Sequence, residues 1–231
     1  MKPICIVFDL DDTLYLERDY AWSGFCALAP WAKATLGLSD FHLKAWALFQ
    51  QGLRGHIFDQ VLSAAGIPPD HNTIRAMVDL YHNHVPVIHL APDAEDCLRI
   101  LRGEVHLALV SDGLEQTQRN KIKALGLEQS FESVVLTSAL GCGYGKPQVK
   151  AFLTVQDHFG GNVLQFFYVG DNPQKDFLGP RCLGWKTIRV RRPLGLWQAL
   201  EASEQEAADW ETPELTTFAN AICERQGNLQ A

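Results

Sequence analysis

Short apolar runs, spaced along the chain, are the clearest structural signal in this sequence. The first, Ile4–Phe8, is continuous and β-branched, which is typical of a strand buried on both faces of a parallel sheet. A second run of this buried type ends at Ser111. Strands are expected over residues 4–8, 105–110, 133–136, 166–169 and 186–190.

Apolar residues at helical spacing fill most of the remaining chain. Before residue 89, helices are expected over residues 17–36, 40–53, 55–65 and from residue 70 or 72 to 84, with no strand between them. After Pro92, strands alternate with helices, which are expected over residues 92–101, 115–125, 148–159 and 174–183. A polar loop over residues 201–206 and a terminal helix over residues 213–225 are expected to follow.

This order predicts an α/β fold with a doubly wound, Rossmann-like parallel sheet and right-handed crossovers. Residues 1–14 and 89–231 would form this core domain, and residues 15–88 would form an inserted α-helical domain. The segment after Pro193 carries no recognisable chemical signature.

Composition and charge narrow the class of protein. The chain has 231 residues, is 47% hydrophobic and 20% charged, and therefore has enough apolar residues for a packed core. Its net charge of −7 argues against a nucleic-acid partner, because proteins that wrap phosphate backbones are usually basic. The basic run Lys186, Arg189, Arg191 and Arg192 is expected to be the solvated end of a strand.

Neither a targeting segment nor a metal motif of the Cys/His type is expected. No stretch reaches the roughly 18 apolar residues of a membrane span, and the first apolar run is too short for a signal peptide, so we expect a cytoplasmic protein without a membrane partner. The six cysteines contain no C-x-x-C pair and are expected to be reduced, mostly buried thiols. The eight histidines lack metal-ligand spacing.

Three acidic residues follow the first strand, in the stretch Phe8-Asp9-Leu10-Asp11-Asp12-Thr13-Leu14. Carboxylates crowded at the end of a buried strand repel one another and resist desolvation. A multivalent cation would relieve both effects, and ligands of open α/β sheets bind at the carboxyl ends of the strands. The stretch alone is also compatible with a loop of solvated acids or with an N-cap cluster for the next helix.

Other chemically distinctive residues follow later strands. Ser111 ends the second strand, Lys146 follows the third after a Gly-rich loop, and Asp171 ends the fourth, with Asp176 five residues on. Each has an ordinary explanation when taken alone. Ser111 could cap a helix, Lys146 could be an exposed lysine, and the two aspartates could be turn residues. In a parallel sheet, however, all these strand ends lie on one edge, which favours a common site.

In this order, the motifs resemble those of the haloacid dehalogenase-like hydrolase superfamily. The first is D-x-D-x-T at residues 9–13, the second is the strand ending in Ser111, the third is Lys146 in Gly-Lys-Pro, and the fourth is G-D-x-x-x-x-D at residues 170–176. The resemblance covers the chain from Ile4 to about Val190. The helical insert resembles the cap of the phosphatase-rich subfamily that carries its cap after the first motif.

The resemblance implies a Mg²⁺-dependent phosphomonoester hydrolase. Asp9 would be the nucleophile and form an aspartyl-phosphate, and Asp11 would be the general acid and base. Ser111 and Lys146 would complete the catalytic set, with Lys146 stabilising negative charge on Asp9 and on the transferred group. A bound Mg²⁺ would screen the two anions that must meet.

The resemblance also assigns binding roles. The metal ligands would be Asp9, the backbone carbonyl of Asp11, Asp171 and Asp176, the last acting through water or by holding Lys146 instead. The residues assigned to binding substrate are Thr13, Ser111, Asp112, Gly113, Lys146 and Asn172.

Alternatives remain within the family. Its dehalogenases lack the second aspartate of the first motif, so Asp11 favours phosphoryl chemistry. A sugar phosphomutase shares this pair, and a non-catalytic binding module with the same fold is a third possibility. The expected substrate is a small phosphorylated metabolite, and the expected state a monomer or homodimer. The cap would set specificity, with Arg18 or Arg54 as an anion contact or simply a solvated arginine.

Overall fold

A six-stranded parallel sheet forms the centre of the chain in the computed structural model, which describes residues 3–230, with side chains through residue 225. Its strand order is β3-β2-β1-β4-β5-β6. Chain order runs outward from β1 in both directions, so β1 lies at the point where the winding reverses. The strands are β1 (Ile4–Phe8), β2 (His106–Ser111), β3 (Ser133–Leu136), β4 (Gln165–Gly170), β5 (Lys186–Val190) and β6 (Trp210–Thr212).

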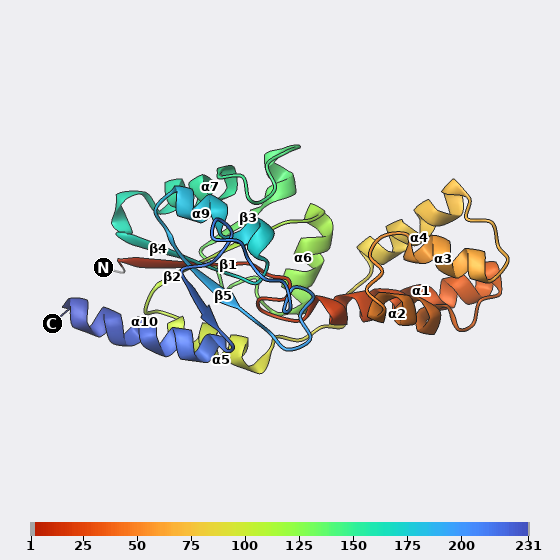
Figure 1. Ribbon diagram of the computed structural model, residues 1–231, viewed down its shortest axis with the longest axis horizontal. Coiled ribbons are helices and arrows are strands. Elements are labelled where there is room, and N and C mark those ends of the chain that lie inside the picture. Colours follow the sequence, from red (N-terminus) through yellow and green to blue (C-terminus); the bar gives the residue numbers. More distant parts are fainter. Residues whose placement is uncertain (1–2, 231) are drawn as a thin grey trace. The chain divides into compact units, whose positions relative to one another are not determined.

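Helices cover both faces of this sheet, as Figure 1 shows, which confirms the doubly wound α/β fold. One face carries α7 (Lys150–Phe159) and α9 (Leu178–Cys182), and the other carries α5 (Pro92–Leu101) packed against α10 (Leu215–Gln230). Two further helices of this part of the chain are α6 (Glu115–Ala124) and α8 (Pro173–Asp176). Under α7, the inward residues of β1, β2 and β4 form a buried cluster with Phe152 and Trp185. Burial of these large apolar side chains contributes about 25 cal/mol per Å² to folding.

The contacts divide the chain into two compact units, residues 1–17 with 89–231, and residues 18–88. The second unit is built on α1 (Glu17–Leu36), α2 (Phe41–Gln50), α3 (Ile57–Ala64) and α4 (His71–Asn83). The sequence analysis placed the first boundary after residue 14. Asp70, and not Asn72, caps α4 by accepting hydrogen bonds from the backbone N–H groups of Asn72 and Thr73.

Aromatic side chains form the interior of the helical unit. Phe25, Phe41 and Phe49 are buried, and Trp46 stacks on Phe49 with ring centroids 5.3 Å apart. Arg18 lies 5.3 Å from the Trp46 ring centroid. Trp46 therefore packs against other residues of this unit.

Arg54 is also held within the helical unit. Its guanidinium lies 3.9 Å from the Phe49 ring centroid and donates hydrogen bonds to the carbonyls of Phe49 and Leu53. Arg54 is exposed, and an anion could bind its guanidinium fully only with the loss of these contacts.

The sequence analysis missed the strand β6 and merged α8 and α9 into one helix. β6 has three residues, two of them exposed, and so lacks the buried apolar run that marks β1, β2 and β4. The expectation of mostly buried cysteines was only partly right. All six thiols are free, but Cys142 and Cys182 are exposed and only Cys5 and Cys97 are fully buried.

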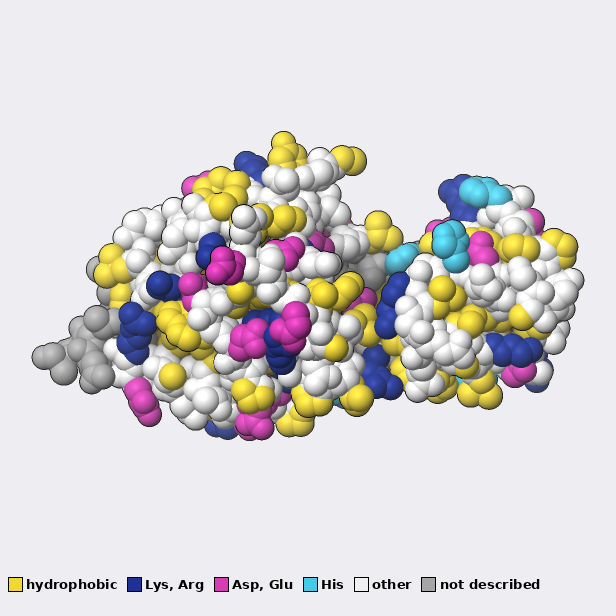
Figure 2. Space-filling view, viewed as in Figure 1, with side chains coloured by type: hydrophobic (Ala, Val, Ile, Leu, Met, Phe, Trp, Pro, Cys, Tyr) yellow, Lys and Arg dark blue, Asp and Glu magenta, His cyan; other side chains and the backbone are white. Residues whose placement is uncertain are grey.

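On the surface, acidic and basic side chains are interspersed over the visible face of the core unit, as Figure 2 shows. Arg191 is one such case, because it pairs with both Glu201 and Glu211. Among the described residues, no helix has both the length and the apolar composition needed to cross a bilayer.

Candidate active site

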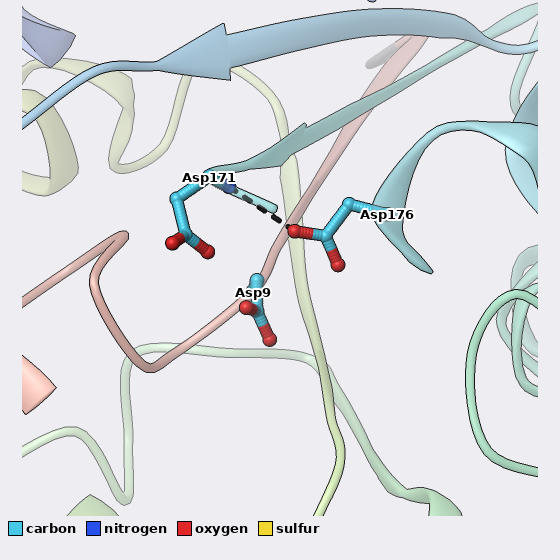
Figure 3. Close-up of side chains that lie close together, drawn as sticks. All are labelled: Asp9, Asp171 and Asp176. Atoms are coloured by element: carbon cyan, nitrogen blue, oxygen red, sulfur yellow. Dashed lines mark hydrogen bonds between the residues drawn. The ribbon is translucent and has the colours of Figure 1, made fainter. Parts of the chain in front are cut away.

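Three buried carboxylates meet at the carboxyl edge of the sheet, from Asp9, Asp171 and Asp176. Asp9 follows β1 and Asp171 follows the adjacent β4, and Phe8 pairs with Val169 in the sheet register. Each residue offers an oxygen that lies within 4.8 Å of those of the other two. Figure 3 shows Asp171 and Asp176 on opposite sides, with Asp9 between and below them. The sequence predicted that these residues lie at one edge of the sheet, and the structure shows that their carboxylates form one cluster.

Lys146 is the principal cation of this cluster. Its ammonium, fully buried, lies 2.7 Å from Asp9 Oδ1 and 2.8 Å from Asp176 Oδ1, and it also donates to the Tyr168 hydroxyl at 2.9 Å. The other oxygen of Asp176 accepts hydrogen bonds from the N–H groups of Asp171 and Asn172. Asp176 therefore holds both Lys146 and the loop after β4, which leaves Asp9 and Asp171 as the carboxylates more open to a ligand.

This donor set fits a hard divalent cation. Asp9 Oδ2 is buried and has no hydrogen-bond partner among the described residues. Burial raises the pKa of Asp9 to about 6 although Lys146 opposes the shift, and burial and then Asp176 raise the pKa of Asp171 well above its usual value. A cation bound to oxygens would satisfy Asp9 Oδ2 and offset the cost of the crowded charges.

Asp11 lies outside this cluster of carboxylates and has its own set of donors. Lys121 Nζ lies 2.7 Å from Asp11 Oδ1, Gln118 Nε2 donates to Oδ2 at 2.8 Å, and the Tyr15 hydroxyl donates to Oδ1. Burial alone would raise the pKa of Asp11, but Lys121 and the hydrogen bonds outweigh it and lower the pKa. Asp11 is therefore held as a carboxylate, the form that can act as a base.

Ser111 and its loop lie beside Asp11. Ser111 is fully buried, and its hydroxyl oxygen accepts a hydrogen bond from Gln118 Nε2 at 2.6 Å. Gly113 has a φ of +121°, which favours glycine, and a Cβ there would lie 3.3 Å from the Gln118 amide and would displace that side chain. Asp112 turns its carboxylate to the Thr137 hydroxyl and the Lys146 N–H, and so fixes the loop that carries Lys146.

Two further residues expected to bind substrate have separate positions. The Thr13 hydroxyl is buried without a hydrogen-bond partner among the described residues. Asn172 caps α8 through its side-chain oxygen, which accepts from the Gln174 N–H. Their contact with substrate stays a prediction.

Two arginines at the carboxyl end of β5 correct the expectation of a solvated basic run. Arg189 is fully buried and donates to the carbonyl of Asp171, and Arg192 is nearly buried and donates to the carbonyl of Thr13. Arginine is tolerated in such places because carbonyl and carboxylate partners satisfy its fork of donors. These two arginines therefore support the loops that carry the site, whereas Lys186 is exposed as expected.

The segment after Pro193 also supports the first loop. Leu196 donates its N–H to Asp12 Oδ2 at 2.7 Å, and Glu17 donates its N–H to Asp12 Oδ1 at 2.8 Å. Asp12 has a φ of +52°, so these two contacts hold a left-handed residue at the turn between Asp11 and α1.

Replacement of Asp93 by asparagine should lower the free energy of unfolding by about 2–3 kcal/mol at pH 7, because it breaks the nearly buried pair with Arg192. Asp93 Oδ1 lies 2.6 Å from Arg192 Nη1, and Oδ2 accepts from the Leu215 N–H at 2.8 Å. Burial would raise the pKa of Asp93, but these hydrogen bonds outweigh it and lower the pKa.

The pKa of Asp93 is lower in the folded than in the unfolded protein. Its contribution to the free energy of unfolding is therefore complete above the unfolded-state pKa of about 3.9, and it is lost as the pH falls through the folded-state pKa. Urea unfolding of Asp93→Asn and of wild type, recorded at several pH values from 3 to 7, measures this difference in the free energy of unfolding. The matched control is Asp96→Asn on the same helix, whose pair with Arg99 is exposed and worth under about 1 kcal/mol. Equal effects of the two changes at pH 7 would contradict the assignment.

Several residues near the site have no counterpart in the sequence motifs used above. They are Tyr168, Gln118, Lys121, Lys175 and Glu17. Burial and Lys146 would lower the pKa of Lys175, but Asp9, Asp176 and Asp171 raise it. Burial and Asp11 raise the pKa of Glu17 to about 7. Gln118 and Lys121 lie three residues apart, on one face of the expected helix. The sequence cannot distinguish such a buried polar pair from one that faces solvent.

Comparison with known proteins places these features in a family. A family model described as haloacid dehalogenase-like hydrolase matches residues 6–190. A phosphoserine phosphatase of Thermus thermophilus is 33% identical over 181 residues, which cover 76% of this chain and 69% of that protein. A glyceraldehyde 3-phosphate phosphatase of Methanopyrus kandleri is 28% identical over 216 residues, which cover 89% of this chain and 91% of that protein.

Solved structures agree on the fold. A HAD-hydrolase of Bacillus subtilis, described as bound to magnesium, superposes with a TM-score of 0.67 at 16% identity and covers 96% of this chain and 99% of that one. An L-2-haloacid dehalogenase of Xanthobacter autotrophicus superposes with a TM-score of 0.63 at 20% identity, covering 96% and 98%. At these identities the likeness concerns the fold and not the reaction.

Proposed function

Because this chain belongs to the haloacid dehalogenase-like hydrolase family, we propose that it is a magnesium-dependent phosphatase that cleaves a small phosphate monoester through an aspartyl-phosphate on Asp9. The observation that carries the proposal is the state of Asp9. One of its oxygens is held by Lys146 at 2.7 Å, and the other is buried without a partner among the described residues, within reach of Asp171. This is an arrangement for a nucleophilic carboxylate beside a cation.

In the first step, a carboxylate oxygen of Asp9 forms a bond to phosphorus while the bond from phosphorus to the leaving oxygen breaks. Asp11 gives that oxygen the proton that it took from water in the hydrolysis step of the preceding turnover, so the product leaves as an alcohol and Asp11 returns to the carboxylate. Lys146 stabilises the charge on Asp9 and on the phosphoryl group, and Ser111 would hydrogen-bond a phosphoryl oxygen. A bound Mg²⁺, held by Asp9, Asp171 and the Asp11 carbonyl, would supply charge neutralisation.

In the second step, the oxygen of a water molecule forms a bond to phosphorus, and Asp11 takes the proton from that water. The bond between phosphorus and Asp9 breaks, which restores the Asp9 carboxylate and releases inorganic phosphate. The lowered pKa of Asp11 supports this step, because it favours the carboxylate that accepts the proton.

The first candidate substrates are three-carbon monoesters, because similar proteins are named as phosphatases of phosphoserine and of glyceraldehyde 3-phosphate. The experiment that tests the function is release of inorganic phosphate with Mg²⁺ from a panel of these two compounds, sugar phosphates and p-nitrophenyl phosphate. Chloride release from 2-chloropropionate is measured in parallel.

We expect phosphate release from at least one three-carbon monoester and no chloride release, since a second aspartate at residue 11 suits protonation of an alkoxide and halide needs no proton. An Asp9→Asn preparation, purified in the same way, controls for contaminating phosphatases. Chloride release, or a panel without any phosphate release, would overturn the proposal.

A further inference from the structure

The carboxylate of Asp11 is fixed by side chains that lie outside the family motifs. Gln118 and Lys121 are on the same face of α6, three residues apart, and both are nearly buried. Lys121 Nζ lies 2.7 Å from Asp11 Oδ1, and the Tyr15 hydroxyl donates to the same oxygen. A buried lysine is costly unless it is paired, so its presence on α6 calls for a reason beyond packing.

Gln118 joins Asp11 to Ser111. Its Nε2 donates to Asp11 Oδ2 at 2.8 Å and to Ser111 Oγ at 2.6 Å, so its two N–H groups serve the ends of β1 and β2 at once. A Cβ at residue 113 would lie 3.3 Å from the same amide, so the glycine leaves room for Gln118 in this position. Gln118 thereby couples the orientation of Asp11 to that of Ser111, which is proposed to hydrogen-bond the phosphoryl group.

The donors leave Asp11 with an uneven capacity to accept a proton. An ionised carboxylate offers about four lone-pair sites, two on each oxygen. Among the contacts that the structure describes, Oδ1 accepts from Lys121 and Tyr15 and is filled, whereas Oδ2 accepts only from Gln118. Oδ2 therefore retains one lone pair, and its direction is set by Gln118.

We propose that Gln118 and Lys121 are positioning residues that orient Asp11 so that Oδ2 removes the proton from the water that hydrolyses the aspartyl-phosphate. This inference rests on the proposed function. It adds the atom that accepts the proton, Asp11 Oδ2, and the two side chains that orient this atom. The water oxygen bonds to phosphorus, its proton moves to Asp11 Oδ2, and the phosphorus bond to Asp9 breaks, so that inorganic phosphate is released. Lys121 and Gln118 act only through Asp11.

p-Nitrophenyl phosphate separates the two chemical steps. Its phenolate leaves without a proton at neutral pH, so formation of the phosphoenzyme does not need Asp11, whereas hydrolysis of the phosphoenzyme does. In rapid-mixing experiments with Mg²⁺, Lys121→Met and Gln118→Leu should keep the initial burst of nitrophenolate within about threefold of wild type. The steady-state rate should fall about 10–100-fold, with phosphoenzyme accumulating.

The matched control is Lys123→Met, which makes the same chemical change at an exposed position of α6 and should behave as wild type. Lys121→Arg, which retains a donor and the charge, should recover part of the steady-state rate. Thermal unfolding of every variant is recorded, so that a loss of folded protein is not read as a kinetic effect.

A double-mutant cycle with Asp11→Asn decides whether the two residues act through Asp11. We expect Lys121→Met to lower the steady-state rate no further in the Asp11→Asn background. Equal slowing of burst and steady state in folded variants, or a full multiplicative loss in the double variant, would overturn the positioning roles while leaving the phosphatase assignment in place. A wild-type chain without any phosphate release would overturn the proposed function and the positioning roles with it.

Discussion

Replacement of Asp9 by asparagine is expected to abolish phosphate release, by at least about 10⁴-fold, while the protein stays folded. An amide does not attack phosphorus, and it is a weaker ligand for a hard cation. The fold should survive because Lys146 keeps its contacts to Asp176 at 2.8 Å and to the Tyr168 hydroxyl at 2.9 Å. Removal of one of the crowded carboxylates also relieves repulsion, so the melting temperature should be unchanged or higher.

Steady-state assays with p-nitrophenyl phosphate, together with circular dichroism and thermal melts, measure both parts of this result. Asp157→Asn, the same change at an exposed position of α7, is the matched control and should retain full activity. Turnover by Asp9→Asn above about 1% of wild type would show that another group makes the first bond to phosphorus.

Removal of divalent cations is the second change with a large expected effect. Chelation should stop turnover, and Mg²⁺ should restore it, because Asp9 and Asp171 carry unrelieved charge and the pKa values of both are raised mainly by burial. Binding should also stabilise the fold. Mg²⁺ at about 100 times its dissociation constant adds about 2.7 kcal/mol, which raises the melting temperature of a chain of this size by roughly 5–10 °C.

This thermal shift is a readout that does not depend on activity. Asp171→Asn should melt higher than wild type without metal, because it removes a repelling charge, and should lose most of the shift with Mg²⁺. The exposed Asp157→Asn should shift as wild type does. Full turnover after exhaustive chelation, or an equal shift in Asp171→Asn, would contradict the assignment of the metal to these carboxylates.

The parallel sheet could be predicted because its central strands β1, β2 and β4 are buried and so appear as apolar runs. β1, β3 and β5 were predicted with their observed bounds. The convergence of Asp9 and Asp171 also followed from the sequence, since parallel strands bring their carboxyl ends to one edge. β6 escaped because its stability comes from pairing with β5 and not from its own composition.

The supports of the site could not be predicted, because their roles depend on partners far away in the chain. Arg189 and Arg192 look like a solvated basic run in one dimension, yet each donates to a backbone carbonyl of a site loop. Lys121 and Gln118 look like ordinary polar residues on a charged helix. Only their contacts in the folded chain show that they face Asp11.

The most direct measurement of the central claim is the site of phosphorylation during turnover. Wild-type protein is mixed with substrate and Mg²⁺, quenched in acid within milliseconds, digested at low pH and analysed by mass spectrometry. One phosphoryl group is expected on the peptide that contains Asp9, in greater yield in Asp11→Asn and absent in Asp9→Asn. Turnover without any label on Asp9, or with the label on Ser111 instead, would contradict the account.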